Sequence, residues 1–123
     1  MKLRCLLVDD EPIARKVIRN HASKLEALEV VGECADAVEA TNFLELHQID
    51  ILFLDIQMPE ITGMEFLKSR KDDFEVILTT AYSEYAVESY QFEVTDYLLK
   101  PFSFARFNDC IEKIKKKRTT KTE

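Results

Sequence analysis

The chain has 123 residues, 46% of them hydrophobic, which suits one compact domain and is too apolar for a disordered chain. Its 17 lysine and arginine residues against 23 aspartate and glutamate residues give a net charge of −6, which disfavours direct binding of nucleic acid. No apolar run approaches the roughly 18 residues that span a bilayer, so we expect no membrane contact. The three cysteines are not spaced as metal ligands and are typical of a reduced, cytoplasmic protein.

The first half of the chain contains two apolar runs, each followed by an amphipathic stretch. Residues 3–8 predict a strand, and Pro12 suits the first turn of the helix that follows. Residues 29–34 predict a second strand, and Asp36 is placed to cap the next helix.

The second half repeats this alternation three times. The predicted strands cover residues 51–54, 76–79 and 97–99. The predicted helices cover residues 63–70, residues 84–90 and a final segment that Ser103 caps. The first, third and fourth apolar runs are nearly continuous, which is typical of central strands covered on both faces. The alternation predicts an α/β domain with a doubly wound parallel sheet.

The last residues of the chain are strongly basic and have two interpretations. Five cations, Lys113, Lys115, Lys116, Lys117 and Arg118, precede residues 119–123. They fit a fraying helix end, where cations are favourable against the helix dipole, or a linker into another domain. We assign residues 1–118 to the domain and residues 119–123 to a tail or the start of a linker.

Polar side chains follow four of the five predicted strands. Asp9 and Asp10 follow the first strand, Asp55 the third, Thr80 the fourth and Lys100 the fifth. Because the carboxyl ends of parallel strands meet at one edge of a sheet, we expect these side chains to lie close together.

This set of residue types predicts a site for an aspartyl phosphate. Clustered carboxylates repel one another unless a cation neutralises them, and hard oxygen ligands suit Mg²⁺. Asp10 and Asp55 could hold that ion, which would leave Asp55 ready as a nucleophile toward phosphorus. Lys100 would add a second positive charge, and Thr80 could donate a hydrogen bond to a phosphoryl oxygen.

Each of these residues alone has a structural explanation. Either Asp9 or Asp10 could cap the first helix, Thr80 could be an ordinary strand residue, and Lys100 could be a solvated lysine. The prediction therefore depends on the whole set. Two histidines lie on helical stretches far from this edge and are expected to be structural: His21 and His47.

The order of these motifs resembles the receiver domain of two-component response regulators. The matching segments are residues 8–12 (Val-Asp-Asp-Glu-Pro), residues 54–59 with Gly63, residues 80–81 (Thr-Ala) and residues 100–102 (Lys-Pro-Phe). The resemblance covers the chain from Leu3 to about Lys117. It implies a flavodoxin-like (βα)5 fold with strand order 2-1-3-4-5.

The resemblance also implies roles for individual residues. Asp55 would accept a phosphoryl group from a sensor histidine kinase. Asp10 would bind Mg²⁺ with support from Asp9, and Gln57 would contribute its backbone carbonyl. Such a domain catalyses only its own phosphorylation and dephosphorylation and is not otherwise an enzyme.

The conformational switch implied by the resemblance is a hydroxyl and an aromatic residue, at Thr80 and Tyr97. Phosphorylation adds about −1.5 to −2 charge at the acceptor. We expect it to alter the face formed by the fourth helix, fifth strand and fifth helix, through which two copies would pair. Three aromatic residues would enrich this face: Tyr85, Tyr90 and Phe92.

A finer resemblance concerns residues 81–86 and 95–102, which look like receivers of the LytTR class. In that class an output domain binds DNA, so this chain would regulate transcription and reach DNA only through an output domain outside these 123 residues. The chain would be an excised or a stand-alone receiver, and the basic tail favours excision.

Three other classes of protein fit less well. A degenerate receiver acting as a binding scaffold would not need the complete set of polar residues. A Mg²⁺-dependent phosphohydrolase of the haloacid dehalogenase type has two aspartates two residues apart after one strand, whereas Gln57 follows Asp55 here. A flavodoxin-like cofactor module needs a phosphate-cradling loop, and the chain has only two glycines.

Overall fold

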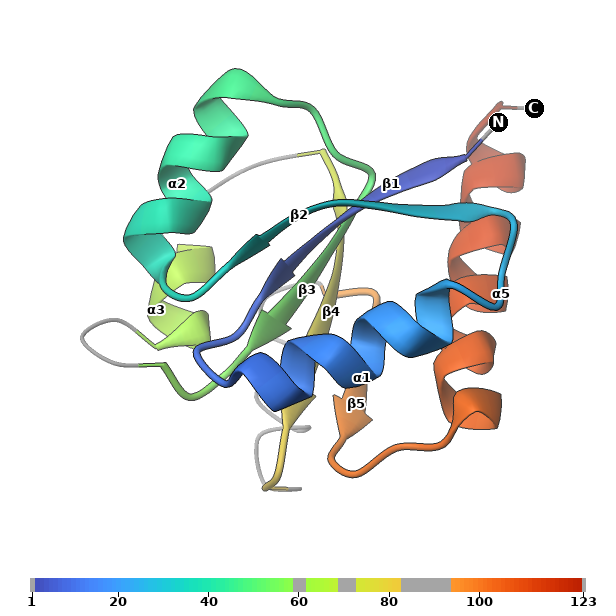
Figure 1. The fold of residues 1–123 in the computed structure, drawn as a ribbon. Coiled ribbons are helices and arrows are strands. Elements are labelled where there is room, and N and C mark those ends of the chain that lie inside the picture. The colour runs from blue at the N-terminus through green and yellow to red at the C-terminus, as the bar shows by residue number, and fades with distance from the viewer. Residues whose placement is uncertain (1, 59–61, 69–72, 83–93, 123) are drawn as a thin grey trace.

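The computed structural model describes residues 2–58, 62–68, 73–82 and 94–122 (Figure 1). Five parallel strands form one sheet in the order β2-β1-β3-β4-β5. The strands are β1 (Leu3–Val8), β2 (Leu28–Cys34), β3 (Ile51–Asp55), β4 (Glu75–Thr80) and β5 (Asp96–Leu99). The helices are α1 (Pro12–Ala22), α2 (Ala37–Leu46), α3 (Gly63–Lys68) and α5 (Phe104–Thr122). The predicted fold class and strand order are confirmed.

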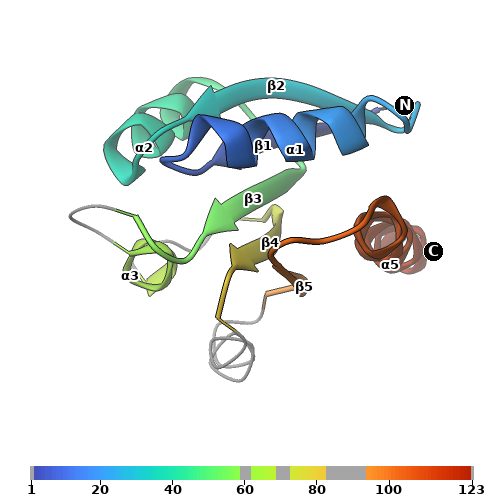
Figure 2. The same cartoon turned by 60° about the horizontal axis from the view of Figure 1, so that its bottom comes forward.

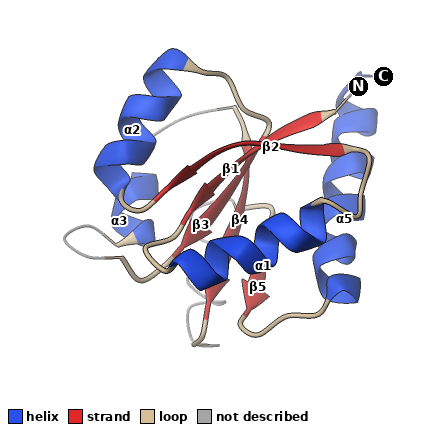
Figure 3. Ribbon diagram, viewed as in Figure 1, coloured by secondary structure: helices blue, strands red, loops and turns tan. Residues whose placement is uncertain are grey.

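Helices cover both faces of the sheet, so the central strands are apolar throughout (Figure 3). Successive side chains of β1 point to opposite faces, with Leu7 in the core beneath α1 and α5 and Leu6 in the core beneath α2 and α3. Every residue of β3 is buried. Figure 2 shows α2 and α3 on one side of the sheet and α5 on the other.

Local capping explains where two helices begin. The Asp36 carboxylate accepts a hydrogen bond from the Glu39 amide at 2.8 Å, and this confirms the predicted cap of α2. The Ser103 hydroxyl accepts one from the Arg106 amide at 3.1 Å at the start of α5. Pro12 is the first residue of α1, as predicted.

The ends of several elements differ from the predicted ones. Strands β4 and β5 begin at buried polar residues, Glu75 and Asp96, which an apolar run does not include. Helix α5 continues to Thr122 and so passes through most of the segment assigned to a tail or linker. The helix predicted over residues 84–90 and its aromatic residues lie outside the described residues.

The two histidines lie away from the carboxyl edge, as expected. The His21 ring packs 5.4 Å from that of Phe107, between α1 and α5. The His47 ring stacks on Phe43 at 4.3 Å, at the end of α2. Within the described part of the chain, no helix combines the length and the apolar character needed to cross a membrane.

Candidate functional site

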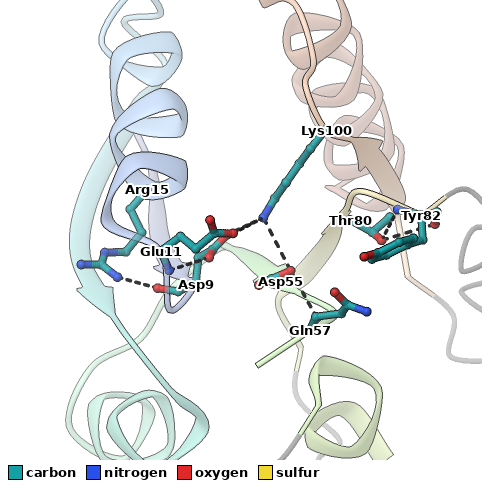
Figure 4. A network of polar contacts seen from close by, with 8 residues as sticks. All are labelled: Asp9, Glu11, Arg15, Asp55, Gln57, Thr80, Tyr82 and Lys100. Atoms are coloured by element: carbon teal, nitrogen blue, oxygen red, sulfur yellow. Dashed lines mark hydrogen bonds and ion pairs between the residues drawn. The ribbon is translucent and has the colours of Figure 1, made fainter. Parts of the chain in front are cut away.

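The candidate site lies where β1, β3, β4 and β5 end. Adjacent parallel strands align Val8 with Leu54 and Asp55 with Thr79, so residues that follow neighbouring strands meet at one edge. Figure 4 shows Lys100 reaching from the end of β5 toward Asp9 and Asp55. The structure brings together four of the five predicted side chains, those of Asp9, Asp10, Asp55 and Lys100. The Thr80 hydroxyl instead contacts Tyr82.

Lys100, which follows β5, contacts polar residues at the ends of two other strands, β1 and β3. Its ammonium lies 2.9 Å from an Asp9 carboxylate oxygen, 3.6 Å from one of Asp55 and 4.0 Å from one of Glu11. Burial works against its charged form, but the hydrogen bond to Asp9 and the charge of Asp55 hold the Lys100 pKa above its ordinary value. The lysine is therefore a fixed positive charge in the site.

The three acidic residues form a group with excess negative charge. Oxygen atoms of Asp9, Asp10 and Asp55 all lie within 4.8 Å of one another. Burial, the charge of Asp9 and to a smaller extent that of Asp10 raise the Asp55 pKa to about 7, although Lys100 acts against them. A bound cation would remove this repulsion more completely than Lys100 does.

The site opens to solvent on the side of Asp10. Asp9 and Asp55 are buried, whereas Asp10 is exposed. A pocket of about 380 Å³ is lined by Asp10, Glu11, Asp55, Gln57, Met58, Ala81 and Lys100. A small, highly charged ligand could enter here and reach Asp55.

Main-chain groups hold the two buried carboxylates in place. The Glu11 amide donates to Asp9 Oδ1 at 2.9 Å, and the Gln57 amide donates to Asp55 Oδ1 at 3.2 Å. The loop after β3 is closed by the Gly63 amide, which donates to the Ile56 carbonyl at 2.8 Å. A Cβ at Gly63 would lie 2.4 Å from the Asp55 carbonyl oxygen, so this close approach requires glycine.

The predicted switch residues lie on the neighbouring strands β4 and β5. The Thr80 hydroxyl is buried and accepts a hydrogen bond at 2.9 Å from the amide of Tyr82, two residues further along the chain. Tyr97 is half-buried. The Arg106 guanidinium lies 5.8 Å from the centre of the Tyr97 ring and donates to the Tyr97 carbonyl at 2.8 Å.

Sequence reasoning missed two groups that support these residues. Arg15 on α1 donates to the Asp9 carbonyl and pairs with Glu33 on β2. Arg106 on α5 pairs with the buried carboxylate of Asp96. Neither pair has a sequence signal, because each depends on which helix packs beside which strand.

The chain is similar in sequence and in structure to bacterial response regulators. It matches the response regulator receiver domain family over residues 5–112. It is 36% identical over 119 residues to the transcriptional regulatory protein BtsR of Escherichia coli K12, which covers 95% of this chain and 50% of BtsR. It is 34% identical to a response regulatory protein of Shewanella oneidensis, which covers 93% of this chain and 49% of that protein. The chain thus spans about half the length of these curated relatives.

Solved structures give the same result. The receiver domain of AraT from Geobacillus stearothermophilus superposes with a TM-score of 0.86 at 32% identity, and the alignment covers all of both chains. The response regulator TrrA from Thermotoga maritima, solved with Mg²⁺ and beryllium fluoride, gives 0.79 at 32% identity and covers 93% of this chain and 99% of that one. The sheet order, the acidic strand ends and these similarities agree, and the chain belongs to the response regulator receiver domain family.

Proposed function

We propose that this receiver is a phosphorylation switch in which Asp55 accepts a phosphoryl group from a sensor histidine kinase. The observation that supports this most strongly is the environment of Asp55. Its buried carboxylate faces an open pocket, 3.6 Å from the Lys100 ammonium and beside Asp9. A carboxylate with this access, beside a fixed cation, is suited to nucleophilic attack on phosphorus.

The same carboxylates fit Mg²⁺. We infer that the carboxylates of Asp10 and Asp55 and the backbone carbonyl of Gln57 hold the ion, with Asp9 in support. The donors are hard oxygen atoms, three of the groups lie within 4.8 Å of one another, and the site has an open side for water ligands. When bound, Mg²⁺ supplies positive charge that stabilises the oxygen atoms of the phosphoryl group.

The remaining residues act on the phosphoryl group itself. An Asp55 carboxylate oxygen forms the new bond to phosphorus, and the bond between phosphorus and the kinase histidine nitrogen breaks, with its electron pair returning to that nitrogen. Lys100 compensates the negative charge of the phosphoryl oxygens. The Thr80 hydroxyl leaves its hydrogen bond with Tyr82 and donates to a phosphoryl oxygen, and Tyr97 responds by turning inward.

The response of Thr80 and Tyr97 would change the face that the predicted fourth helix would form with β5 and α5, and two receivers would pair through it. We infer that this pairing controls an output domain of the LytTR class, which binds DNA and regulates transcription. One comparison supports the transcriptional role: BtsR is a transcriptional regulatory protein, and this chain spans about half of its length. We also infer that the receiver acts in the cytoplasm, where a kinase would meet it, because all three cysteines are buried free thiols.

The experiment is incubation with acetyl phosphate, with and without Mg²⁺, followed by intact-mass measurement. We expect a gain of one phosphoryl group that requires Mg²⁺ and is absent from Asp55→Asn. The matched control is Asp109→Asn, which changes an exposed aspartate of α5 and should gain the group as the wild type does. Equal phosphorylation of Asp55→Asn would refute Asp55 as the acceptor. No gain in the wild type would favour a binding scaffold.

A further inference from the structure

We propose that Arg15 is a positioning residue for the metal-binding acids and that Glu33 holds it in place. Arg15 would fix the loop between β1 and α1 so that Asp9 and Asp10 face Asp55. This inference rests on the proposed Mg²⁺ site and adds to it two residues that touch neither the ion nor the phosphoryl group.

The Arg15 guanidinium connects the acidic loop to β2, and Figure 4 shows its contact with Asp9. Its Nη1 donates to the Asp9 carbonyl at 2.5 Å, and its Nε donates to a Glu33 carboxylate oxygen at 3.1 Å. Glu33 lies on β2, in register with Leu7 of β1. The Asp9 amide also donates to the Cys34 carbonyl at 3.0 Å. Asp9 is thus attached to β2 by its own amide and, through Arg15, by its carbonyl.

The position of the Asp9 carbonyl determines where Asp10 begins. The peptide group between Asp9 and Asp10 is planar, so fixing the carbonyl oxygen also fixes the direction of the Asp10 amide and Cα. Asp10 is exposed at the open side of the pocket, so burial does little to orient its side chain. The hydrogen bond from Arg15 is therefore placed to hold the exposed metal ligand toward the two buried carboxylates.

Only an arginine can make this connection. Its planar guanidinium presents several donors in fixed directions, so it can bind a carbonyl and a carboxylate at once. The Arg15 side chain is 18% exposed and that of Glu33 is 29% exposed, so the bridge is partly shielded from water. A lysine would keep the charge but has one compact ammonium group on a flexible stem.

Charge and position predict opposite effects of Arg15 on cation binding. A positive charge near the acids repels Mg²⁺, so electrostatics alone predicts tighter binding when Arg15 is neutralised. A positioning role predicts weaker binding, even when the charge is kept. Arg19 is the natural comparison, because it donates to the other Glu33 oxygen at 2.7 Å while its side chain is half exposed. Its recorded contacts within the described residues do not include Asp9.

The test is Mn²⁺ titration followed by electron paramagnetic resonance, with Mg²⁺ as competitor. We compare the wild-type chain with four variants of the same length: Arg15→Lys, Arg15→Gln, Glu33→Gln and the control Arg19→Lys. We expect Arg15→Lys to weaken Mg²⁺ affinity about tenfold, as is typical when a partner of a metal ligand is lost. We expect Arg15→Gln and Glu33→Gln to weaken the Mg²⁺ affinity as well. Arg19→Lys should leave the affinity within about twofold, because it changes only the exposed ion pair between Arg19 and Glu33.

Urea unfolding in EDTA separates positioning from a general loss of structure. The proposal requires that the affinity of Arg15→Lys falls while its urea midpoint stays close to that of Arg19→Lys. Should Arg15→Lys unfold, Glu33→Asp gives the comparison with Arg15 intact, because it keeps the negative charge and only shortens the side chain that holds the guanidinium. Unchanged affinity in folded Arg15→Lys, or tighter binding by Arg15→Gln, overturns the positioning role alone. Failure of the wild type to bind Mn²⁺ or Mg²⁺ overturns the proposed metal site together with this inference.

Discussion

Asp55 is a buried carboxylate among other acids, and this makes it a source of instability. Burial and the charge of Asp9 raise its pKa from an ordinary value of 3.8 to about 7. Between these values the folded state binds more protons than the unfolded state, so the stability of the fold falls as the pH rises through this window. The receiver gives up stability to keep this buried carboxylate at a pocket that opens to solvent.

We therefore expect Asp55→Asn to stabilise the domain in a pH-dependent way. In buffer with EDTA, the free energy of unfolding of the variant should exceed that of the wild type by about 2 kcal/mol at pH 8. The difference should shrink toward pH 4, where Asp55 is protonated in the folded wild type. Urea unfolding at several pH values measures this difference. Asp109→Asn, on the exposed side of α5, should show no such trend. A constant difference across the pH range would contradict the raised pKa.

Gly63 permits the tight loop that follows Asp55. A Cβ at this position would meet backbone atoms, at 2.4 Å from the Asp55 oxygen and 2.9 Å from the Ile56 Cα. We expect Gly63→Ala to lower the free energy of unfolding by about 1–3 kcal/mol, because backbone atoms must shift. At Gly32 the added Cβ would meet the far end of the Phe43 ring, which can rotate, so Gly32→Ala should cost less. A Gly63→Ala cost close to zero in urea unfolding would show that the loop tolerates the methyl group.

At the scale of elements, a buried carboxylate joins β5 to α5. Asp96 accepts from Arg106 at 3.1 Å and from the Cys110 thiol at 3.1 Å, and Lys113 lies 3.2 Å away. Burial alone would raise the Asp96 pKa, but the hydrogen bonds from Arg106 and Cys110 lower it to about 2. These contacts attach α5 to the strand that carries Tyr97.

Loss of Arg106 should expose the cost of burying Asp96. We expect Arg106→Met to reduce stability by about 2 kcal/mol at neutral pH, since the carboxylate stays buried with less compensation. Because the Asp96 pKa is lowered, its contribution is present above about pH 4 and is lost as the pH falls toward 2, so the deficit should shrink there. Thermal unfolding of the variant and the wild type, from neutral pH down to about pH 2, measures this deficit in stability.

Lys113→Met is the matched control, because Lys113 pairs with the same carboxylate but its side chain is 55% exposed. Its effect should stay below about 1 kcal/mol. If the two variants lose the same stability, the geometry of the Arg106 pair is not what holds β5 and α5 together.

At the scale of the whole molecule, apolar patterning was sufficient to predict a doubly wound α/β domain, whereas the strand order came from the resemblance to receiver domains. Continuous runs such as residues 51–54 are typical of central strands, and parallel strands bring Asp9, Asp55 and Lys100 to one edge whatever the details of packing. The roles of these residues remain predictions from the family and from the chemistry of the site.

Features that depend on contacts between distant elements could not be predicted. Glu75 begins β4 as a buried acid because Lys117 of α5 reaches it at 2.9 Å, and an apolar run does not include such a residue. Arg118 contacts Asp50 at 2.9 Å, so two of the basic residues that suggested a fraying end or a linker, Lys117 and Arg118, are paired with the amino-terminal edge of the sheet. Only the packing of α5 determines these partners.

The most direct test of the account is to identify the phosphorylated residue chemically. The domain is treated with acetyl phosphate and Mg²⁺, the acyl phosphate is reduced with borohydride to homoserine, and peptides are sequenced by mass spectrometry. We predict homoserine at position 55, dependent on Mg²⁺. Homoserine at Asp9 or Asp10 instead, or none in protein shown to be folded, would contradict it.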